Sequence, residues 1–585
     1  MVALSAGART LLLSLGYDPA ALAAPAKAEP AFDVPGLAVE PAASGPGPGQ
    51  ARRFRLTDGA REWTLETKVA LGDEDLRALA HVVARLAPAG STARLQADGH
   101  AAGNVFVGLV VAFEGERVPV NLVSADIGCG LALVPVVDRR GRHLTRSDDA
   151  GEALRFHSYV LACIRRALKR GKVAETGASA SAYLDEASAF YGAERDAWLR
   201  EMAAVMRAVG VDFGGDGGDG NAAAVLAHVG RFAQSLGSSG NHFLELAADD
   251  AGKYWLVVHS GSRALGAAVH AVVAEACRAT CPGGFEVATG ALARFYARAY
   301  DALNQFAKLN RVICAVAVLD GLGLETSALA LRAAMAATDL FRGGGDALLG
   351  GLTHNGLKAF VDDGRRLVAH VLSKGAIAVS RREAAVIVAL RAGEGCCAFT
   401  LVDPTCPWRE CALADVPPGY AAVEPGDGLL FAGHGAGRCQ STSETARQST
   451  FQEVADLFAR EGIAGNIAPG VLGDNPGRAY KPSAEILPHL PLAEAATRSM
   501  LRTCASHKEG LTYKRADVAA CAKYVEGAYR AHPLAPLWCD FNLVRGHLPA
   551  DAFGEGCALR DRLLAELGAA YDFTPAPRST GAGAP

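Results

Sequence analysis

The chain has 585 residues, of which half are apolar and 7% aromatic, and its formal net charge is −4 at pH 7. This length can bury a large core, so the composition indicates a soluble globular protein with a main domain and appendages. The negative net charge excludes a global attraction for nucleic acid, so any contact with a polyanion must come from a local basic patch.

The N-terminal part carries little sign of a fold. Residues 8–15 form a weak apolar run with one embedded Arg9, which is too short and too poorly flanked to span a membrane. Residues 19–52 are rich in Ala, Pro and Gly, which predicts a flexible linker. From Glu74 to Leu86 apolar residues recur at helical spacing, which predicts an amphipathic helix.

The rest of the chain alternates between strand-like and helical patterns, which predicts an α+β fold with mixed α and β elements. Strands are expected at 105–113, 118–123, 131–137, 254–258, 367–372 and 384–390. Helices are expected at 152–170, 185–208, 222–235, 263–280 and 289–308. Residues 213–220 hold five glycines among aspartates, a composition typical of a flexible loop.

Cysteine usage favours a reducing, cytoplasmic location. The 14 cysteines include no CxxC pair. The closest groupings are Cys277 with Cys281, Cys396 with Cys397, and Cys406 with Cys411, and none has the spacing of a zinc ribbon or finger.

Two basic clusters are candidates for contact with an RNA backbone, although such a cluster is more often a solvated face or loop. The first comprises Arg139, Arg140, Arg142 and Arg146, and the second comprises Arg165, Arg166, Lys169, Arg170 and Lys172.

Four short segments place metal-competent side chains beside glycine or at the end of an apolar run. They are Asp126-Ile127-Gly128-Cys129-Gly130, Asn241-His242-Phe243-Leu244-Glu245, His259-Ser260-Gly261-Ser262-Arg263 and Thr353-His354-Asn355. A lone histidine at a strand end is more often a satisfied polar residue than a ligand. Together, however, imidazoles, a carboxylate and a thiolate make a plausible set for two borderline divalent ions, and cysteine argues against Mg²⁺.

A fifth segment, Gly433-His434-Gly435-Ala436-Gly437-Arg438, surrounds a histidine with glycines. Glycines let backbone N–H groups approach a phosphate, and Arg438 can offer a planar fork to its oxygens. His434 would then be placed to attack phosphorus. The alternative is a glycine-rich turn with an incidental histidine.

In this order, the five segments resemble the active-site motifs of the RtcB family of RNA-splicing ligases, over a region from about Leu95 to about Gly510. The resemblance implies a large mixed α/β catalytic domain at residues 61–510. Residues 1–60 would be an N-terminal segment with the linker, and residues 511–585 a C-terminal extension of unknown role.

The resemblance also implies roles for individual residues. Asp126, Cys129 and His242 would hold one Mn²⁺, while Cys129, His259 and His354 would hold a second. His434 would be the catalytic nucleophile, and Asp98 matches an acidic residue that the family needs nearby. The residues implied to seat GTP are Asn241, His242, Phe243, Leu244, Glu245, His354, Asn355, His434, Gly435, Ala436, Gly437 and Lys508.

In the reaction that the resemblance implies, His434 attacks the α-phosphate of GTP and pyrophosphate leaves. The guanylyl group then moves to an RNA 3′-phosphate, and a 5′-hydroxyl attacks with release of GMP. Broken or spliced RNA, tRNA included, would be the substrate, and a 2′,3′-cyclic phosphate could be opened beforehand. Whether an activating protein partner is needed stays open.

Three departures from the family pattern leave alternatives. Leu372 and Ser373 stand where the family has histidine and arginine, Thr442 stands where it has arginine, and a Pro-Gly-Ser-Met-Gly loop that contacts guanine has no counterpart between Gly375 and Gly433. The alternatives are an RNA 3′-end guanylyltransferase, a metal-dependent phosphoesterase that does not seal RNA, and a non-catalytic RNA-binding paralogue.

Overall fold

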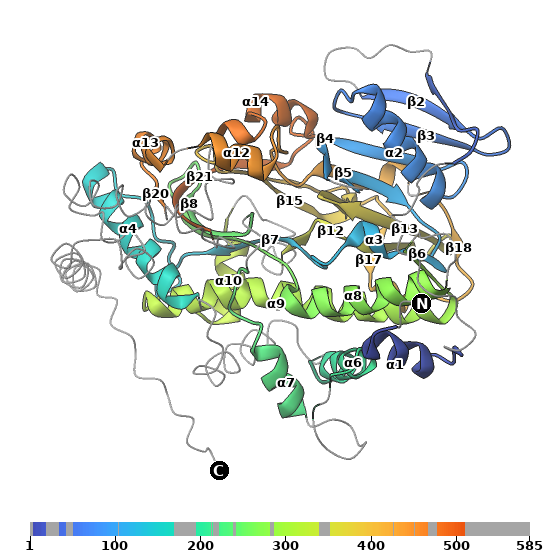
Figure 1. Cartoon of the computed structure of the whole chain (residues 1–585). Coiled ribbons are helices and arrows are strands. Elements are labelled where there is room, and N and C mark those ends of the chain that lie inside the picture. Colours follow the sequence, from blue (N-terminus) through green and yellow to red (C-terminus); the bar gives the residue numbers. More distant parts are fainter. Residues whose placement is uncertain are drawn as a thin grey trace.

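The computed structural model of the chain is a mixed α and β fold, as expected from the sequence (Figure 1). The structure describes residues 4–18, 34–42, 51–102, 105–168, 195–211, 213, 222–237, 241–280, 286–338, 351–424, 426–449, 451–465 and 477–508. The predicted loop at 214–220, the basic residues from Lys169 to Lys172 and the predicted C-terminal extension at 511–585 lie outside these ranges.

The larger sheet has nine strands and joins the N-terminal part of the chain to its middle. In spatial order it comprises β1 (Ala38–Pro41), β2 (Arg52–Thr57), β3 (Glu62–Thr67), β4 (Thr92–Ala102), β5 (Val105–Ala112), β13 (Leu367–Lys374), β12 (Asn355–Asp362) and β17 (Arg409–Cys411), with β18 (Ala421–Ala422) beside β13. The pairing of β5 with β13 joins segments that are more than 250 residues apart in sequence.

The second sheet has eight strands, and its central strands are almost fully buried. In spatial order it comprises β11 (Leu352–Thr353), β7 (Gly130–Pro135), β9 (Tyr254–Ser260), β8 (Phe243–Ala248), β21 (Thr497–Lys508), β16 (Cys396–Leu401) and β15 (Ala384–Ala389), with β20 (Ala464–Gly465) beside β21. Two pairs complete the strands: β6 (Arg117–Pro119) with β10 (Val287–Thr289), and β14 (Ala376–Ser380) with β19 (Leu429–Gly433).

The helices lie around these sheets (Figure 1). They are α1 (Ala6–Ser14), α2 (Asp73–Leu86), α3 (Val120–Val123), α4 (Ala150–Ala167), α6 (Arg195–Ala208), α7 (Ala222–Gly230), α8 (Arg263–Thr280), α9 (Gly290–Gly321), α10 (Ala328–Ala336), α12 (Thr442–Gln448), α13 (Phe451–Glu461) and α14 (Ser483–Ile486). Helix α9 packs against β7 and β9, and α1 and α6 pack outside α8 and α9. Helix α2 contacts β3 and begins with three acidic residues, which suit the positive end of a helix dipole.

Helix α9 is the central helix of the core. It is long and apolar enough to cross a membrane by length and composition, but 83% of its most apolar window is buried inside the molecule. This burial is the pattern of a core helix. Its fully buried Arg311 donates hydrogen bonds from Nη1 to the carbonyl oxygens of Gly128 and Ser260, at 2.8 and 2.7 Å. Helix α9 thereby supports two of the loops that carry candidate metal ligands.

One predicted strand is wrong in part. The segment 118–123 was expected to be a strand, but β6 ends at Pro119 and the short helix α3 follows at once. Proline lacks the N–H that a strand ladder needs, and its fixed φ suits the start of a helix. The apolar residues Val120, Leu122 and Val123 of α3 are buried, so the run is apolar because of burial rather than because of sheet pairing.

The predicted flexible linker at 19–52 is also wrong in part. Residues 38–41 form β1, which pairs antiparallel with β2 at the edge of the larger sheet. Strand pairing satisfies backbone hydrogen bonds whatever the side chains are, so composition alone did not reveal it. Residues 19–33 and 43–50 lie outside the described residues, and the division of the chain near residue 60 stays a prediction.

Candidate functional site

Five neighbouring strands of the eight-stranded sheet bring four of the five candidate metal ligands, Cys129, His242, His259 and His354, to one end of the sheet. Thr353 pairs with Gly130, Gly130 with Ser260, and His259 with Phe243, which in turn pairs with Lys508. Cys129, His242 and His354 are the sequence neighbours of Gly130, Phe243 and Thr353. The pairing of these strands, which come from distant parts of the chain, therefore brings the three residues together.

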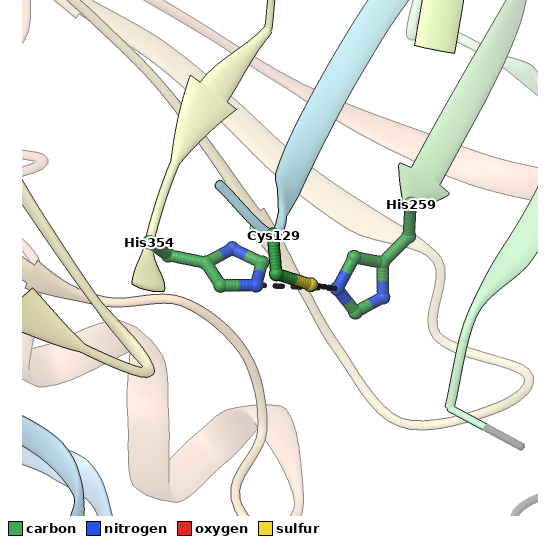
Figure 2. Close-up of side chains that lie close together, drawn as sticks. All are labelled: Cys129, His259 and His354. Carbon is green, nitrogen blue, oxygen red and sulfur yellow. Dashed lines mark hydrogen bonds between the residues drawn. The ribbon is translucent and has the colours of Figure 1, made fainter. Parts of the chain in front are cut away.

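Three side chains meet at the centre of this site. Figure 2 shows Cys129, His259 and His354 turned toward one another from three different segments. The Sγ atom of Cys129 lies 3.2 Å from Nε2 of His259, which lies 3.2 Å from Nε2 of His354. All three side chains are buried.

A second group of donors shares Cys129. Its Sγ atom lies 3.2 Å from Nε2 of His242, and the same nitrogen lies 3.3 Å from Oδ2 of Asp126. Within each of the two groups the donor atoms lie within 4.8 Å of one another. Tetrahedral ligands about 2.1 Å from one ion lie about 3.4 Å apart, so these contacts have the spacing of donors around a shared cation.

Backbone carbonyls orient two of the imidazoles. Nδ1 of His242 donates to the carbonyl oxygen of Leu236 at 2.8 Å, and Nδ1 of His259 donates to that of Asn241 at 3.0 Å. Each bond fixes the tautomer and leaves the Nε2 lone pair facing the cluster, which is how histidine ligands of metals are usually held. Nδ1 of His354 has no hydrogen-bond partner among the described residues.

The electrostatics of the cluster favour neutral imidazoles at His259 and His354. Burial lowers the pKa of His259 and His354 well below the usual value, and the neighbouring histidines add to this effect. Burial, together with Asp126, raises the pKa of Cys129 well above that of a free thiol. Burial also acts to raise the pKa of Asp126, but His242 and the Cys129 thiol outweigh it and lower that pKa. A divalent cation would stabilise the thiolate, which is the ligand form of cysteine.

This donor set fits borderline divalent ions better than hard ones. It contains imidazole nitrogens, one carboxylate and a thiolate common to both groups. Nitrogen and sulfur ligands suit ions such as Mn²⁺, Zn²⁺ or Co²⁺ within mixed sites, whereas Mg²⁺ prefers oxygen. The cluster is therefore a candidate metal site.

His434 lies beside this cluster, at the end of β19. Its ring centroid is 4.6 Å from that of His354. Because Ala376 of β14 pairs with Gly433, the turn before β14 lies against the His434 ring. Ala376 N also donates to the carbonyl oxygen of His354 at 3.1 Å, so the β14–β19 pair is joined directly to a candidate ligand segment.

Asp98 fixes the orientation of His434. This carboxylate is fully buried, and its Oδ2 atom accepts hydrogen bonds from Nδ1 and the backbone N of His434 at 2.7 and 3.0 Å. Gly435 N is a weaker third donor at 3.4 Å. A proton held on Nδ1 leaves the Nε2 lone pair free. Oδ1 of Asp98 has no hydrogen-bond partner among the described residues.

Two glycines of the His434 segment make room for Asp98. A Cβ atom at Gly433 would press on the Asp98 carboxylate, and one at Gly437 would collide with the Asp98 backbone. Gly437 also has a positive φ of 69°, which favours glycine. These glycines therefore allow the Asp98 carboxylate to approach closely. From the sequence, the glycines of this segment were expected only to let backbone N–H groups approach a phosphate.

The cluster and His434 share one cavity of about 410 Å³. Of the residues implied to seat a nucleotide, Asn241, Phe243, His354, Asn355, His434, Gly435, Ala436, Gly437 and Lys508 line it. His242, Leu244 and Glu245 are not among the lining residues. Leu244 is fully buried, and Glu245 accepts hydrogen bonds from the hydroxyls of Ser506 and Thr503.

Arg438 lines the cavity, but its guanidinium is already engaged. It donates to the carbonyl oxygen of Gln440, to the hydroxyl of Tyr480 and, at 3.3 Å, to Thr445. The guanidinium also lies over the Tyr480 ring. The main contacts of Arg438 thus stabilise the loop after His434.

Four further lining residues were not singled out from the sequence as site residues: His100, Lys374, Arg391 and Tyr480. His100 stands two residues after Asp98 and Lys374 precedes Gly375, so their neighbours gave a usable signal. Arg391, which pairs with Glu394 at 2.8 Å, and Tyr480 had none.

Two of the residues that depart from the family pattern do not line the cavity, and only the first basic cluster is fully described. Leu372 and Ser373 are fully buried in β13 and are not among the residues that line the cavity. The first basic cluster follows β7, and its Arg142 is paired with Asp138. Most of the second cluster lies outside the described residues or has an undescribed side chain.

One of two comparisons with known proteins agrees with the motifs. A comparison with curated proteins found no match to the chain. A family model described as tRNA-splicing ligase RtcB matches residues 80–329, the stretch that contains Asp98, Asp126, Cys129, His242 and His259. Residues 80–329 are therefore an RtcB domain.

Proposed function

We propose that the chain is a GTP- and Mn²⁺-dependent RNA ligase that joins a 3′-phosphate or 2′,3′-cyclic phosphate end to a 5′-hydroxyl end. The observation that carries the proposal is the position of His434, which contacts Asp98 on one side and faces the candidate metal cluster on the other. The family match adds that RtcB proteins are tRNA-splicing ligases. A non-catalytic RNA-binding protein would need neither the nucleophile nor the donor set.

His434 would act through Nε2. Asp98 holds the proton on Nδ1, so the Nε2 lone pair is available to attack the α-phosphorus of GTP. A new N–P bond forms as the bond to pyrophosphate breaks. Positive charge develops on the imidazole ring, and the buried Asp98 carboxylate stabilises it.

The following steps transfer the same guanylyl group. An oxygen of the RNA 3′-phosphate attacks the guanylyl phosphorus, and His434 leaves as a neutral imidazole. The 5′-hydroxyl oxygen of the other RNA end then attacks the activated 3′-phosphorus and its proton passes to solvent, so a phosphodiester forms and GMP leaves with the electron pair of the broken P–O bond. When bound, two Mn²⁺ ions would orient the phosphate oxygens and neutralise the charge that develops on them.

Cationic side chains around the cavity suit phosphate-rich substrates. Lys508 lines the cavity at the end of β21, and Lys374 lines it with its ammonium 2.6 Å from the Ser124 hydroxyl. Arg391 lies on the turn between β15 and β16. These groups support binding of GTP and an RNA end in the same space.

The second candidate is the same chemistry without sealing. Leucine and serine at positions 372 and 373 are buried in β13, so this strand lacks the histidine and the arginine that the family pattern has there. Their absence favours an RNA 3′-end guanylyltransferase or a phosphoesterase as the second candidate. A binding-only paralogue is the third outcome.

Labelled GTP tests the nucleophile. The full chain is incubated with Mn²⁺ and GTP labelled at the α-phosphate, and protein-bound label that is lost in acid is measured. We expect label on the wild type and none on His434→Ala. The matched control is His489→Ala, because His489 does not line the cavity. Equal labelling of wild type and His434→Ala would refute the proposal.

RNA substrates then separate the outcomes. A 3′-phosphate fragment and a 5′-hydroxyl fragment should give joined product with a ligase, and a capped but unjoined 3′ end with a guanylyltransferase. Loss of a cyclic phosphate without protein labelling would indicate a phosphoesterase, and RNA binding without either change would indicate a binding protein. We also propose a cytoplasmic location, which the free thiols of the described cysteines support.

A further inference from the structure

A second cavity, of about 520 Å³, lies apart from the His434 cavity, and the described residues lining the two do not overlap. Its lining includes Lys308 of α9, Thr353 of β11, Lys358 of β12, Arg382, and Trp408 with Glu410 near β17. The RtcB motifs do not include these residues, except that Thr353 precedes His354.

The wall of this cavity is basic. Among the described residues it carries the side chains of Lys308, Lys358, Arg382 and Arg409 against a single carboxylate, Glu410. The buried Lys358 is satisfied, because Nζ donates to Glu410 at 3.0 Å and to the carbonyl oxygen of Ala378 at 2.8 Å. Arg409 is also paired, with Asp363.

The other two basic side chains of the wall, those of Lys308 and Arg382, have no such partner among the described residues. Within the described part of the chain, the side chains of Lys308 and Arg382 take part in no hydrogen bond or ion pair. Burial lowers the pKa of Lys308; Glu410 and, more weakly, Asp301 oppose this effect, while Lys358 and Arg311 add to it. The ammonium group of Lys308 is therefore poorly compensated, and an anion placed beside it would relieve that condition.

Trp408 gives the cavity a planar wall and an optical reporter. Its side chain is 6% exposed, and its indole packs against Gly428, where a Cβ atom would collide with the ring. Trp408 is one of five tryptophans in the chain. A ligand in this cavity would change the environment of this indole.

We propose that this basic cavity is a second binding site for a phosphate group, carried either by a free nucleotide or by an RNA strand. The inference goes beyond the proposed ligase reaction, because it concerns residues that the His434 chemistry does not use. Paired Lys358 and Arg409 would hold the wall in place, while Lys308 and Arg382 would contact the phosphate oxygens.

The position of the cavity gives it a route to the catalytic site. Thr353, which lines it, precedes His354 directly, and its hydroxyl donates to Asn304 of α9 at 2.7 Å. Strand β12 lines the His434 cavity with Asn355 and the second cavity with Lys358. A ligand beside Lys358 would thus contact the same strand that borders the candidate metal cluster.

Tryptophan fluorescence of the full chain tests the proposal. The probes are inorganic phosphate, GMP, and a short oligoribonucleotide with hydroxyls at both ends, which lacks the 3′-phosphate that ligation requires. We expect a saturable change in fluorescence that disappears in Trp408→Phe. Lys308→Gln and Arg382→Ala should each weaken the affinity about tenfold, since each removes one charge-assisted contact.

The control is Arg294→Ala, which removes an exposed arginine from α9 outside the cavity. A response to the oligoribonucleotide alone would assign the phosphate to RNA, and a response to phosphate and GMP alone would assign it to a free nucleotide. The proposal is overturned if no probe gives a response that depends on Trp408, or if Arg382→Ala binds as tightly as Arg294→Ala. Arg382 is exposed, so its replacement should leave the fold intact even if Lys308→Gln does not. The fluorescence assay measures binding and not catalysis, so His434→Ala should still bind the probes in this cavity. If the labelling experiment with GTP failed, the evidence for this second binding site would not change.

Discussion

Replacing Asp98 tests whether this carboxylate sets the reactivity of His434. The Oδ2 atom accepts hydrogen bonds from Nδ1 and from the backbone N of His434, while Oδ1 has no partner among the described residues. Asp98→Asn can therefore keep its amide oxygen at the Oδ2 position, with the amide nitrogen at the position of Oδ1. The tautomer of His434 would survive, and only the negative charge would be lost.

The size of the effect follows from this geometry. A hydrogen bond to a charged group contributes about 1.5–3 kcal/mol and a neutral one about 1 kcal/mol, so Asp98→Asn should lose roughly 0.5–2 kcal/mol. That loss corresponds to guanylylation slowed about 2- to 30-fold. Asp98→Ala removes the acceptor altogether, so the proton of the His434 ring is no longer held on Nδ1. In a serine protease triad, disturbing the tautomer costs about 10⁴-fold, so a loss of about 10³- to 10⁴-fold is expected here.

The assay is single-turnover transfer of label from α-labelled GTP to the protein at saturating Mn²⁺, with thermal unfolding as a check of the fold. We expect the labelling rate to be highest for the wild type, lower for Asp98→Asn and lowest for Asp98→Ala. If Asp98→Ala reacts as fast as the wild type while His434→Ala is inactive, the role given to Asp98 is refuted. Equal, complete loss in both Asp98 variants would instead show that the charge, and not the tautomer, dominates.

Three other perturbations have defined outcomes. Cys129→Ser removes the atom shared by both donor groups, so bound Mn²⁺ measured by elemental analysis should fall to near zero, whereas His242→Ala, which belongs to one group, should leave about one ion. Nζ of Lys481 donates to the carbonyl oxygens of Ala97 and Gly99 on either side of Asp98, so Lys481→Met should slow guanylylation about tenfold with GTP affinity unchanged, and Lys481→Arg should recover part of the rate. Burial raises the pKa of Asp301 to about 6, although the backbone N–H groups of Ala414 and Leu413 act to lower it. Because this folded-state pKa lies above the usual value, the protonated carboxyl stabilises the fold below about pH 4 and that contribution is lost by about pH 6, so urea unfolding should show the wild type losing up to about 3 kcal/mol relative to Asp301→Asn across this range.

Motif order was the strongest information in the sequence. The segments around Cys129, His259 and His354 predict metal chemistry from side-chain type alone, and the structure brings these residues together. The role of each as a ligand stays a prediction. Long buried strands such as β7 and β9 were also predictable, because apolar runs bounded by turn residues identify them.

Pairing and register were not predictable, because they depend on contacts between distant segments. Nothing local to Gly130 indicates that it pairs with both Thr353 and Ser260, yet that register forms the candidate site. The strand β1 was missed for a related reason, since its partner β2 stabilises it and its composition does not. Arg391 and Tyr480 reach the cavity only through such tertiary placement.

The proposed nucleophile, His434, and the candidate metal ligands belong to different sheets, and a few short contacts set the distance between them. The donors stand at one end of the eight-stranded sheet, whereas His434 ends the β14–β19 pair. Ala389 N donates to the carbonyl oxygen of His434 at 3.2 Å, and Asn355 Oδ1 accepts from Gly375 N at 2.8 Å beside His354. Phosphoryl transfer depends mainly on positioning and charge. These two hydrogen bonds therefore matter as much for the proposed reaction as the candidate metal ligands do. Asn355 is therefore better explained as a residue that positions the β14 turn than as a contact to the nucleotide alone.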